Sequence, residues 1–438
     1  MPSPAQTTKL SLEPEVGKPT QFQSCTILSL PNELLLRVIA LLSTVSIPNL
    51  MVNRSLRSVC EQGLYRSISL PRYPRRSIRL LETFLHRPDL ALLVRHLEID
   101  FSWLFPGLFP QDQVPSAIQP DGLVALSLAK NLNSLSLAGV ASWIWEPEMA
   151  KLREAIFKMK LIRLDVPLIR DPHTEYACVW PGDSDIEDDW NGDLGDEIRK
   201  LLQAQPLLEE FKFSDSSITY KTSASLRNNL KHSDVPSLKS LQASPHLAMA
   251  FLPVANRLES LNLRIEDWDD RLLSDMETKS TAIKLAIRHF TIRVWYHDEW
   301  LWSNLAKVFA LFPKTEELSV AINSLTTATD VEPASYFFEM VGKNIYHLPS
   351  LRHIEVKFET LYPETPGIFE VGTDSLVEYK IACPTLETVV DPAKRLWTFR
   401  YNHQGSGDFE HWLVGPLIKE RLAPVKDLPA PEGSNSLR

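Results

Sequence analysis

The chain has 438 residues, of which 44% are hydrophobic and 23% are charged, proportions that are typical of soluble globular proteins. This length is too great for one compact core, and it predicts either several domains or an extended array of repeats. The formal net charge of −9 argues against a nucleic-acid-binding protein, because binding to phosphates requires a basic surface.

Four cysteines are scattered along the chain: Cys25, Cys60, Cys178 and Cys383. They are too few and too widely spaced to predict a disulfide framework, and no Cys-x-x-Cys pair indicates a zinc site. The first 24 residues lack the apolar core of a signal peptide, and we expect them to be disordered. The longest apolar run, residues 34–42, is far shorter than the roughly 20 residues of a membrane span. We therefore expect a cytoplasmic or nuclear protein without metal, cofactor or membrane contact.

Residues 28–42, "LSLPNELLLRVIALL", predict a short helix that begins at Pro31. Proline suits the first helical position, because its fixed φ matches the helix and its missing N–H is not needed there. Glu33 then lies in the first turn, where a negative charge interacts favourably with the helix dipole. The apolar arc is wider than the stripe that a core-facing helix requires. The surplus apolar surface either packs on the rest of the chain or binds a partner in a helix-in-groove contact.

A second apolar segment follows Pro48 and predicts further short helical pieces. Together the two segments resemble an F-box, with its opening Leu-Pro-x-Glu, an apolar-Asn-Arg patch and a later Leu-Tyr-x-x-Ile-x-Leu. The matching residues are Leu30, Pro31, Glu33, Leu34, Leu35, Val38, Ile39, Leu42, Val52, Asn53, Arg54, Leu64, Tyr65, Ile68 and Leu70. The later part is similar to fungal F-box proteins in particular. The link from Ser43 to Pro48 departs from the family, because it carries no charged residue.

This resemblance implies a trihelical F-box over residues 25–70 that binds the Skp-type adaptor of an SCF ubiquitin ligase, and through it the cullin scaffold. It implies that the adaptor contacts Leu30, Pro31, Glu33, Leu34, Leu35, Val38, Ile39 and Leu42. The apolar side chains of this set would be buried by the adaptor. Pro31 and Glu33 would fix the start of the helix.

Arginines dominate the next stretch, with nine arginines and three acidic residues between residues 54 and 96. We interpret them as a solvated face, with a patch for phosphate or an acidic partner as the alternative. Aromatic residues are not interleaved with these arginines, which argues against binding to nucleic acid. Residues 71–89 are expected to connect the F-box-like motif to the rest of the chain.

From about residue 90, strand-like pieces recur with apolar residues at positions i, i+3 and i+5. They start at Val94, Leu132, Leu161, Leu208, Leu238, Leu258, Ile287 and Leu351, with a poorer copy at Thr315 and a weak copy at Leu386, at spacings between 20 and 47 residues. Helix-like stretches precede most of them, and one strand plus one helix per unit is the leucine-rich-repeat pattern. We predict an α/β chain in which residues 90–418 form a curved, degenerate leucine-rich-repeat-like solenoid. Residues 419–438 are expected to be a disordered tail.

Two irregular insertions interrupt this array: residues 101–120 are rich in proline and aromatics, and residues 171–197 are strongly acidic. Such insertions form loops on one face of a solenoid, often the binding face, so Trp180 and Trp190 are candidate partner-binding residues. The acidic insertion does not predict an EF-hand, because a loop that starts at Asp185 has Trp190 where glycine is required. We interpret it as a solvated loop, with contact to a basic partner as the alternative.

Aromatic residues are dense between residues 294 and 302, "VWYHDEWLW". Trp295, Trp300 and Trp302 could anchor a bound peptide, and we keep them as candidate partner-binding residues. They could equally fill the space between a strand and the next helix, and this second interpretation is the one we favour.

Catalytic motifs are missing from the sequence, which has neither Gly-x-Ser-x-Gly nor a glycine-rich phosphate loop. We therefore expect a non-catalytic chain. The F-box resemblance implies a substrate receptor that binds the adaptor through the F-box and an unknown protein substrate through the repeats. The alternative is a leucine-rich-repeat scaffold whose N-terminal helices only cap the solenoid. Exposure of the apolar arc at residues 34–42 would favour adaptor binding, and its burial against residues 90–140 would favour the cap.

Overall fold

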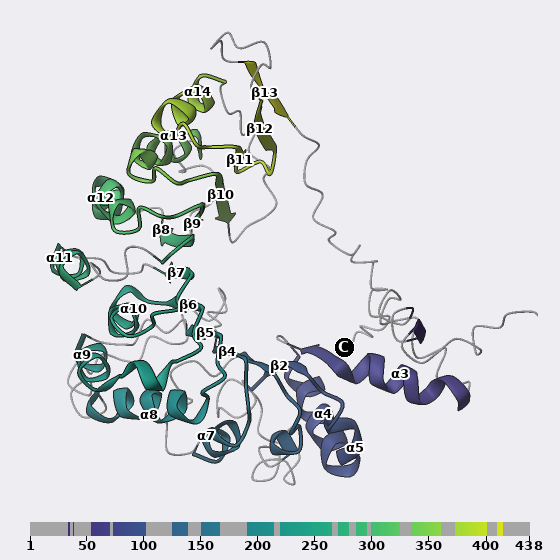
Figure 1. Ribbon diagram of the computed structural model, residues 1–438. Coiled ribbons are helices and arrows are strands. Elements are labelled where there is room, and N and C mark those ends of the chain that lie inside the picture. Colours follow the sequence, from purple (N-terminus) through teal and green to yellow (C-terminus); the bar gives the residue numbers. More distant parts are fainter. Residues whose placement is uncertain are drawn as a thin grey trace, which may run out of the picture. The chain divides into compact units, whose positions relative to one another are not determined.

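The structure is a computed structural model that divides into two compact units, residues 1–66 and residues 67–438, which are described separately (Figure 1). The described residues are 34–35, 38, 54–70, 73–101, 125–138, 150–166, 191–213, 220–264, 270–279, 286–295, 299–324, 334–360, 373–400 and 410–414. No helix of these ranges is long and apolar enough to cross a membrane.

The first unit contains helix α3 (Arg54–Arg66), which lies in the later part of the F-box-like motif. Its side chains Leu56, Val59 and Cys60 are buried. On its exposed side, Arg57 Nε lies 3.2 Å from Glu61 Oε1, an (i, i+4) ion pair that supports the helix. The amphipathic pattern predicted after Pro48 is therefore a helix from Arg54 onward.

A 13-stranded sheet runs through the second unit, with its strands in sequence order. The strands are β1 (Ser67–Leu70), β2 (His96–Asp100), β3 (Ser134–Ala138), β4 (Arg163–Val166), β5 (Glu210–Phe213), β6 (Ser240–Ala243), β7 (Ser260–Arg264), β8 (His289–Trp295), β9 (Glu317–Ser324), β10 (His353–Thr360), β11 (Thr388–Val390), β12 (Leu396–Arg400) and β13 (Glu410–Val414). Strands β1 to β11 pair in parallel, and β12 and β13 add antiparallel pairs.

Helices follow most strands, as a parallel sheet requires. They are α4 (Pro74–His86), α5 (Pro88–Ala91), α7 (Ala150–Phe157), α8 (Asn191–Ala204), α9 (Tyr220–Asn229), α10 (Pro245–Phe251), α11 (Asp270–Lys279), α12 (Glu299–Ala310), α13 (Ala334–Asn344) and α14 (Thr373–Ala382), with 3-10 turns η7 (His232–Asp234) and η9 (Ile345–His347). Helices α7 to α14 lie along one face of the sheet (Figure 1). The other face carries none of the described helices α7 to α14, and we call it the open face.

The predicted α/β class and its strand–helix repeat are confirmed. Each of the ten strand-like pieces found in the sequence contributes a strand, from β2 to β11. The apolar positions of one strand are register partners of those on the next, as Leu135 is of Leu164. Both leucines are buried on the helix side, so the core of each unit continues into the next.

Backbone hydrogen bonds repeat from unit to unit just before each strand. The carbonyl of Arg95 accepts hydrogen bonds from the N–H groups of Asn133 (2.8 Å) and Ser134 (3.0 Å). The carbonyl of Asn133 accepts the equivalent pair from Ile162 and Arg163. One carbonyl thus holds two amides of the following repeat, which fixes the register although the intervening segments differ in length.

The sheet begins at Ser67, within the range that the sequence assigns to the F-box-like motif. Ile68 and Leu70 are register partners of Leu97 and Ile99 on β2. Helix α4, in the expected connecting segment, packs on β1 and β2 and buries Phe84 and its apolar neighbours. The end of the motif is therefore also the first strand of the sheet.

The parallel order ends at a turn organised by Asp391, which is 1% exposed. Its carboxylate accepts hydrogen bonds from the backbone N–H of Arg395 (2.9 Å), from Arg395 Nε (2.6 Å) and from Trp397 Nε1 (2.9 Å). Lys394 adopts a φ of 61° within this turn. The turn reverses the chain, so that β12 pairs antiparallel with β11 and covers the edge of the parallel sheet.

Candidate protein-binding surface

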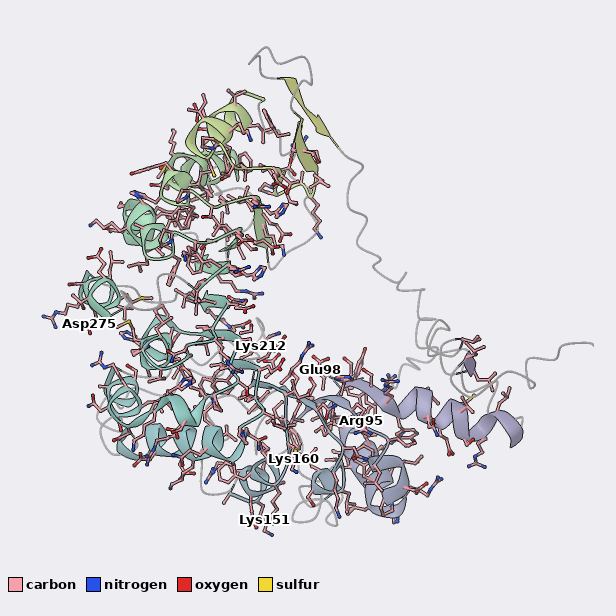
Figure 2. The ribbon with its side chains drawn as sticks, viewed as in Figure 1. Arg95, Glu98, Lys151, Lys160, Lys212 and Asp275 are labelled. Atoms are coloured by element: carbon pink, nitrogen blue, oxygen red, sulfur yellow. The ribbon has the colours of Figure 1, made fainter. Side chains whose placement is uncertain are left out.

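Polar side chains line the open face in rows that run across the strands. Because side chains alternate between the two faces of a strand, residues between the buried apolar positions point to the open face. The first row is Ser67, His96, Ser134, Arg163, Glu210, Ser240, Ser260, His289, Glu317, His353 and Thr388. The second row is Ser69, Glu98, Ser136, Asp165, Lys212, Gln242, Asn262, Thr291, Ser319, Glu355 and Val390. Glu98 and Lys212 on this face are labelled in Figure 2.

Neighbours within a row contact one another. In the first row, Arg163 Nε lies 3.3 Å from Glu210 Oε2. In the second row, Asn262 Nδ2 donates a hydrogen bond of 3.1 Å to Gln242 Oε1. These two contacts join polar side chains on adjacent strands, β4 with β5 and β6 with β7.

Asp165 has an unusual environment near the start of this surface. Burial raises the pKa of its carboxyl group to about 6, and the nearby charges of Glu98 and Glu210 act in the same direction. The ammonium group of Lys212, its register partner, lowers the pKa, but not enough to offset the burial. This part of the surface therefore gains a proton at mildly acidic pH.

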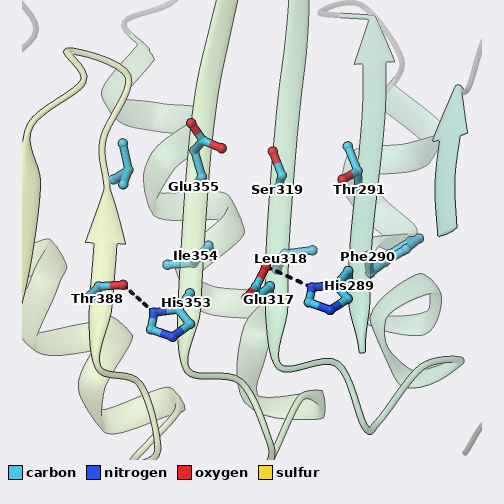
Figure 3. A pocket seen from close by; sticks show the side chains of 11 residues that line it. His289, Phe290, Thr291, Glu317, Leu318, Ser319, His353, Ile354, Glu355 and Thr388 are labelled. Carbon is cyan, nitrogen blue, oxygen red and sulfur yellow. Dashed lines mark hydrogen bonds and ion pairs between the residues drawn. The ribbon is translucent and has the colours of Figure 1, made fainter. Parts of the chain in front are cut away.

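A shallow hollow of about 380 Å³ lies over strands β8 to β11 (Figure 3). Its rim in the first row holds two contacts: His289 Nδ1 lies 2.8 Å from Glu317 Oε2, and His353 Nδ1 lies 2.7 Å from Thr388 Oγ1. The small Ser319 lies in the second row, on the strand between the two histidines. The hollow thus presents imidazole, carboxylate and hydroxyl groups, which suit hydrogen bonds to a polar segment of another protein.

Within the described ranges, no group of three or more His, Cys, Asp or Glu side chains could hold a metal ion. The buried thiol of Cys383 lies 3.5 Å from the carbonyl oxygen of Leu348 and 3.4 Å from that of Leu351. It lies among backbone groups of the preceding repeat and therefore has a packing role.

The adaptor-binding residues expected from the F-box resemblance are described only in part. Leu34 is 44% exposed, Leu35 is 5% exposed and Val38 is half-buried, and all three are helical. The remaining five lie outside the described residues: Leu30, Pro31, Glu33, Ile39 and Leu42. The adjacent side chains of Leu34 and Leu35 therefore differ in exposure: the first is accessible to a partner, and the second is buried.

The candidate tryptophans are not brought together by the described part of the structure. Trp302 on α12 is 8% exposed, and its ring centroid lies 4.8 Å from that of Phe337 on α13. It fills the space between two helices, in line with the packing interpretation. Trp180 and Trp190, and the side chains of Trp295 and Trp300, lie outside the described residues.

No family model matches the chain, and no curated protein matches it. Among solved structures, it is similar to the leucine-rich-repeat-containing protein LegL7 from Legionella pneumophila, with 16% sequence identity and a TM-score of 0.36. That likeness covers 61% of this chain and 79% of the other.

The residues of the hollow were not among those singled out in the sequence. Their signal was present, because the apolar pattern at i, i+3 and i+5 leaves positions i+2 and i+4 for the opposite face. In the unit that starts at Ile287 these are His289 and Thr291, and in the unit that starts at Leu351 they are His353 and Glu355. The pattern indicates the face of each residue but not which residues become neighbours.

Proposed function

We propose that the chain is a non-catalytic receptor that binds a protein partner on the open face of its sheet. The observation that carries this proposal is the pair of polar rows that cross the parallel strands. The hollow over β8 to β11 is lined by residues of both rows. A surface of this kind offers many hydrogen-bonding groups on a rigid frame, which suits recognition of an extended protein surface.

The finer proposal is that this receptor delivers its partner to an SCF-type ubiquitin ligase. The F-box-like motif would bind the Skp-type adaptor, and the adaptor would join the chain to the cullin scaffold. Two features support this: the residues of the motif at its characteristic spacing, and the 44% exposure of Leu34 at a position where the family contacts its adaptor. Ubiquitin transfer would then follow from positioning, without chemistry by this chain.

The test is capture of a purified Skp-type adaptor by the full chain and by a Leu34→Asp variant. We expect the variant to lose at least ten-fold in adaptor affinity, because a carboxylate cannot enter an apolar interface without a large desolvation cost. Leu92→Asp is the matched control, since Leu92 is also exposed (42%) but lies in the second unit. Equal capture by the wild type and the Leu34 variant would refute adaptor binding through this motif.

A second candidate function is a leucine-rich-repeat scaffold whose N-terminal helices cap the solenoid. One observation favours it: Ile68 and Leu70, which match the F-box pattern, belong to the first strand of the sheet. A capping role predicts that the wild-type chain captures no adaptor. It also predicts that Leu34→Asp lowers the melting temperature of the second unit, whereas adaptor binding predicts no such change.

A further inference from the structure

Among the described elements, α14 is the last helix of the chain, and it has apolar side chains on two opposite sides. One side is packed. The ring of Tyr379 is fully buried, stacks on Phe338 of α13 at a centroid distance of 4.7 Å, and donates a hydrogen bond of 2.6 Å to the carbonyl oxygen of Phe338. Gly342 of α13 leaves room for this ring, because a Cβ atom at that position would overlap with it. Tyr379 therefore marks the side of α14 that faces the preceding repeat.

Val377 and Ile381 lie on the opposite side of α14, and we call these two residues the end stripe. Each is two residues away from Tyr379, so its side chain is rotated by about 160° from that ring around the helix axis. Val377 is 37% exposed and Ile381 is 65% exposed, and their spacing of four residues places them next to each other on the helix surface. On α13, by contrast, Phe338 faces the next helix and is buried.

A third side of α14, between Tyr379 and the end stripe, faces the sheet. Lys380 lies on this side, and its Nζ atom is 4.1 Å from the ring centroid of Phe399 on β12. The same Nζ atom donates a hydrogen bond of 2.7 Å to the carbonyl oxygen of Leu386. With α13 on one side and the sheet on the next, the end stripe faces the place where a following helix would pack in a longer array.

The chain returns to this end of the array in β13, which lies beside β12 (Figure 1). β12 is antiparallel to β11 and β13 is antiparallel to β12, so β13 runs in the direction of the repeat strands. Its last residue, Val414, is the register partner of Trp397, which in turn is that of Val389 on β11. β13 therefore ends at the edge of the sheet where each strand from β3 to β10 leads into a helix. Two strand spacings, roughly 10 Å, separate β13 from β11, and this is also the usual distance between packed helices.

Residues 415–423, "GPLIKERLA", follow directly and lie outside the described residues; we call them the cap segment. Their sequence has the pattern of a short amphipathic helix that begins at Pro416, and the proline directly after the segment would end it. Leu417, Ile418 and Leu422 fall within an arc of about 140° around such a helix, which is wide enough for contacts with both a helix and a sheet. A helix this short is not stable alone, so it would depend on packing against the array.

The charges beside the two apolar surfaces are of opposite sign. Glu378 is exposed and follows Val377 on α14. In the cap segment, Arg421 falls within the apolar arc, on the side of Leu417. The aliphatic part of an arginine can cover apolar surface while its guanidinium group stays in water, where Glu378 is a suitable partner.

We propose that the cap segment, residues 415–423, packs on the end stripe of Val377 and Ile381 and forms the C-terminal cap of the repeat array. The last unit of such an array has apolar surface that no further unit covers, and a terminal cap with a polar outer face removes it from water. The array then extends past residue 418, where the sequence pattern places its end. This contact lies on the helix side of the sheet, so it is independent of partner binding on the open face and of the F-box-like motif.

The test is amide hydrogen exchange of the full chain, followed by mass spectrometry. We expect the Leu417→Asp, Ile418→Asp double variant to speed exchange at the α14 amides at least ten-fold, because carboxylates cannot stay against apolar surface. The matched control is Leu428→Asp with Leu437→Asp, which places two aspartates beyond the cap segment and should change these rates less than two-fold. Exchange at the α7 amides should be equal in all three chains, which shows that the rest of the array is folded. Equal rates at α14 in the wild type and the cap variant would overturn the proposal.

A change on the other side of the contact completes the test. Ile381→Asp should speed exchange at α14 at least ten-fold in the wild-type chain, but less than two-fold when added to the cap variant, because both changes break the same contact. Comparable effects in the two backgrounds would contradict a contact between the cap segment and Ile381. Sedimentation velocity tests the other occupant of the end stripe. A dimer that Ile381→Asp dissociates and the cap variant leaves intact would show that a second copy of the chain covers the stripe, and would also overturn the proposal.

Discussion

At the scale of single residues, Asp165 shows how a sheet position can set the charge of a side chain. Its neighbours in β4, Leu164 and Val166, are buried on the helix side. Because side chains alternate between the two faces of a strand, the carboxyl group of Asp165 lies on the open face. There it is half-buried between strands, and this burial raises its pKa to about 6 despite the opposing effect of Lys212. The ionised carboxylate therefore destabilises the folded chain at neutral pH.

The consequence for stability has a definite sign. Because the folded-state pKa is raised above the ordinary value of 3.8, the folded protein binds more protons than the unfolded chain between about pH 4 and 6. The free energy of unfolding should fall by about 2–3 kcal/mol as pH rises through this window. Asp165→Asn should abolish this fall and stabilise the protein at pH 7. Urea unfolding at pH 4.5 and 7 measures both effects.

The control for this prediction is Glu82→Gln on α4, which removes a carboxylate from another part of the second unit. This control should keep the wild-type difference between the two pH values. If Asp165→Asn also keeps that difference, the titration of Asp165 is not linked to folding.

At the scale of elements, a charge ladder crosses seven successive repeats at the residue just before each strand. Its members alternate in sign: Glu209, Lys239, Glu259, Arg288, Glu316, Arg352 and Glu387. Lys239 Nζ lies 2.9 Å from Glu209 Oε1, while the Arg288–Glu316 and Arg352–Glu387 pairs lie at 3.8 Å. Exposed pairs of this kind contribute little stability each, so the effect of the ladder should depend on its alternating signs and on the salt concentration.

Reversing one charge tests the ladder. Lys239→Glu should lower the free energy of unfolding by about 1 kcal/mol at low salt, because it removes an ion pair and places like charges on three adjacent repeats. The loss should shrink in 0.5 M NaCl, where screening shortens the range of these interactions. Adding Glu209→Lys should recover part of the loss. A cost that is independent of salt would show that Lys239 acts through packing instead.

The sequence predicts where the repeat strands lie, but it does not predict which residues become neighbours on the open face. The positions of the repeat strands were predictable, because eight of the ten units carry apolar residues at i, i+3 and i+5 that must face the helices, and the units at Thr315 and Leu386 carry two of the three. The neighbours on the open face were not predictable. Arg264 and Arg293 lie 29 positions apart, and only the hydrogen bonds between strands make them partners. Strands β12 and β13 follow no repeat pattern, and their antiparallel pairing depends on the buried turn at Asp391.

At the scale of the whole molecule, the chain consists of two units with a division at Arg66, and the sequence pattern does not reveal this point. The F-box resemblance runs on to Leu70, because an alternating Ile-x-Leu fits a strand of the sheet as well as the end of the family motif. The last residues of the F-box-like motif thus form the edge strand that pairs with β2.

Two shortened chains test what this edge strand contributes, one beginning at Ser67 and one at Tyr73. The first keeps β1, so the free energy of unfolding of the second unit should stay within about 0.5 kcal/mol of that in the full chain. The second chain loses the register partners of Leu97 and Ile99 and exposes the backbone edge of β2. It should be less stable by about 2–4 kcal/mol, from lost apolar burial and ladder hydrogen bonds. Urea unfolding gives the difference, and faster hydrogen exchange at the β2 amides should accompany it. Equal free energies of unfolding for the two shortened chains would mean that β1 does not contribute to the stability of the second unit.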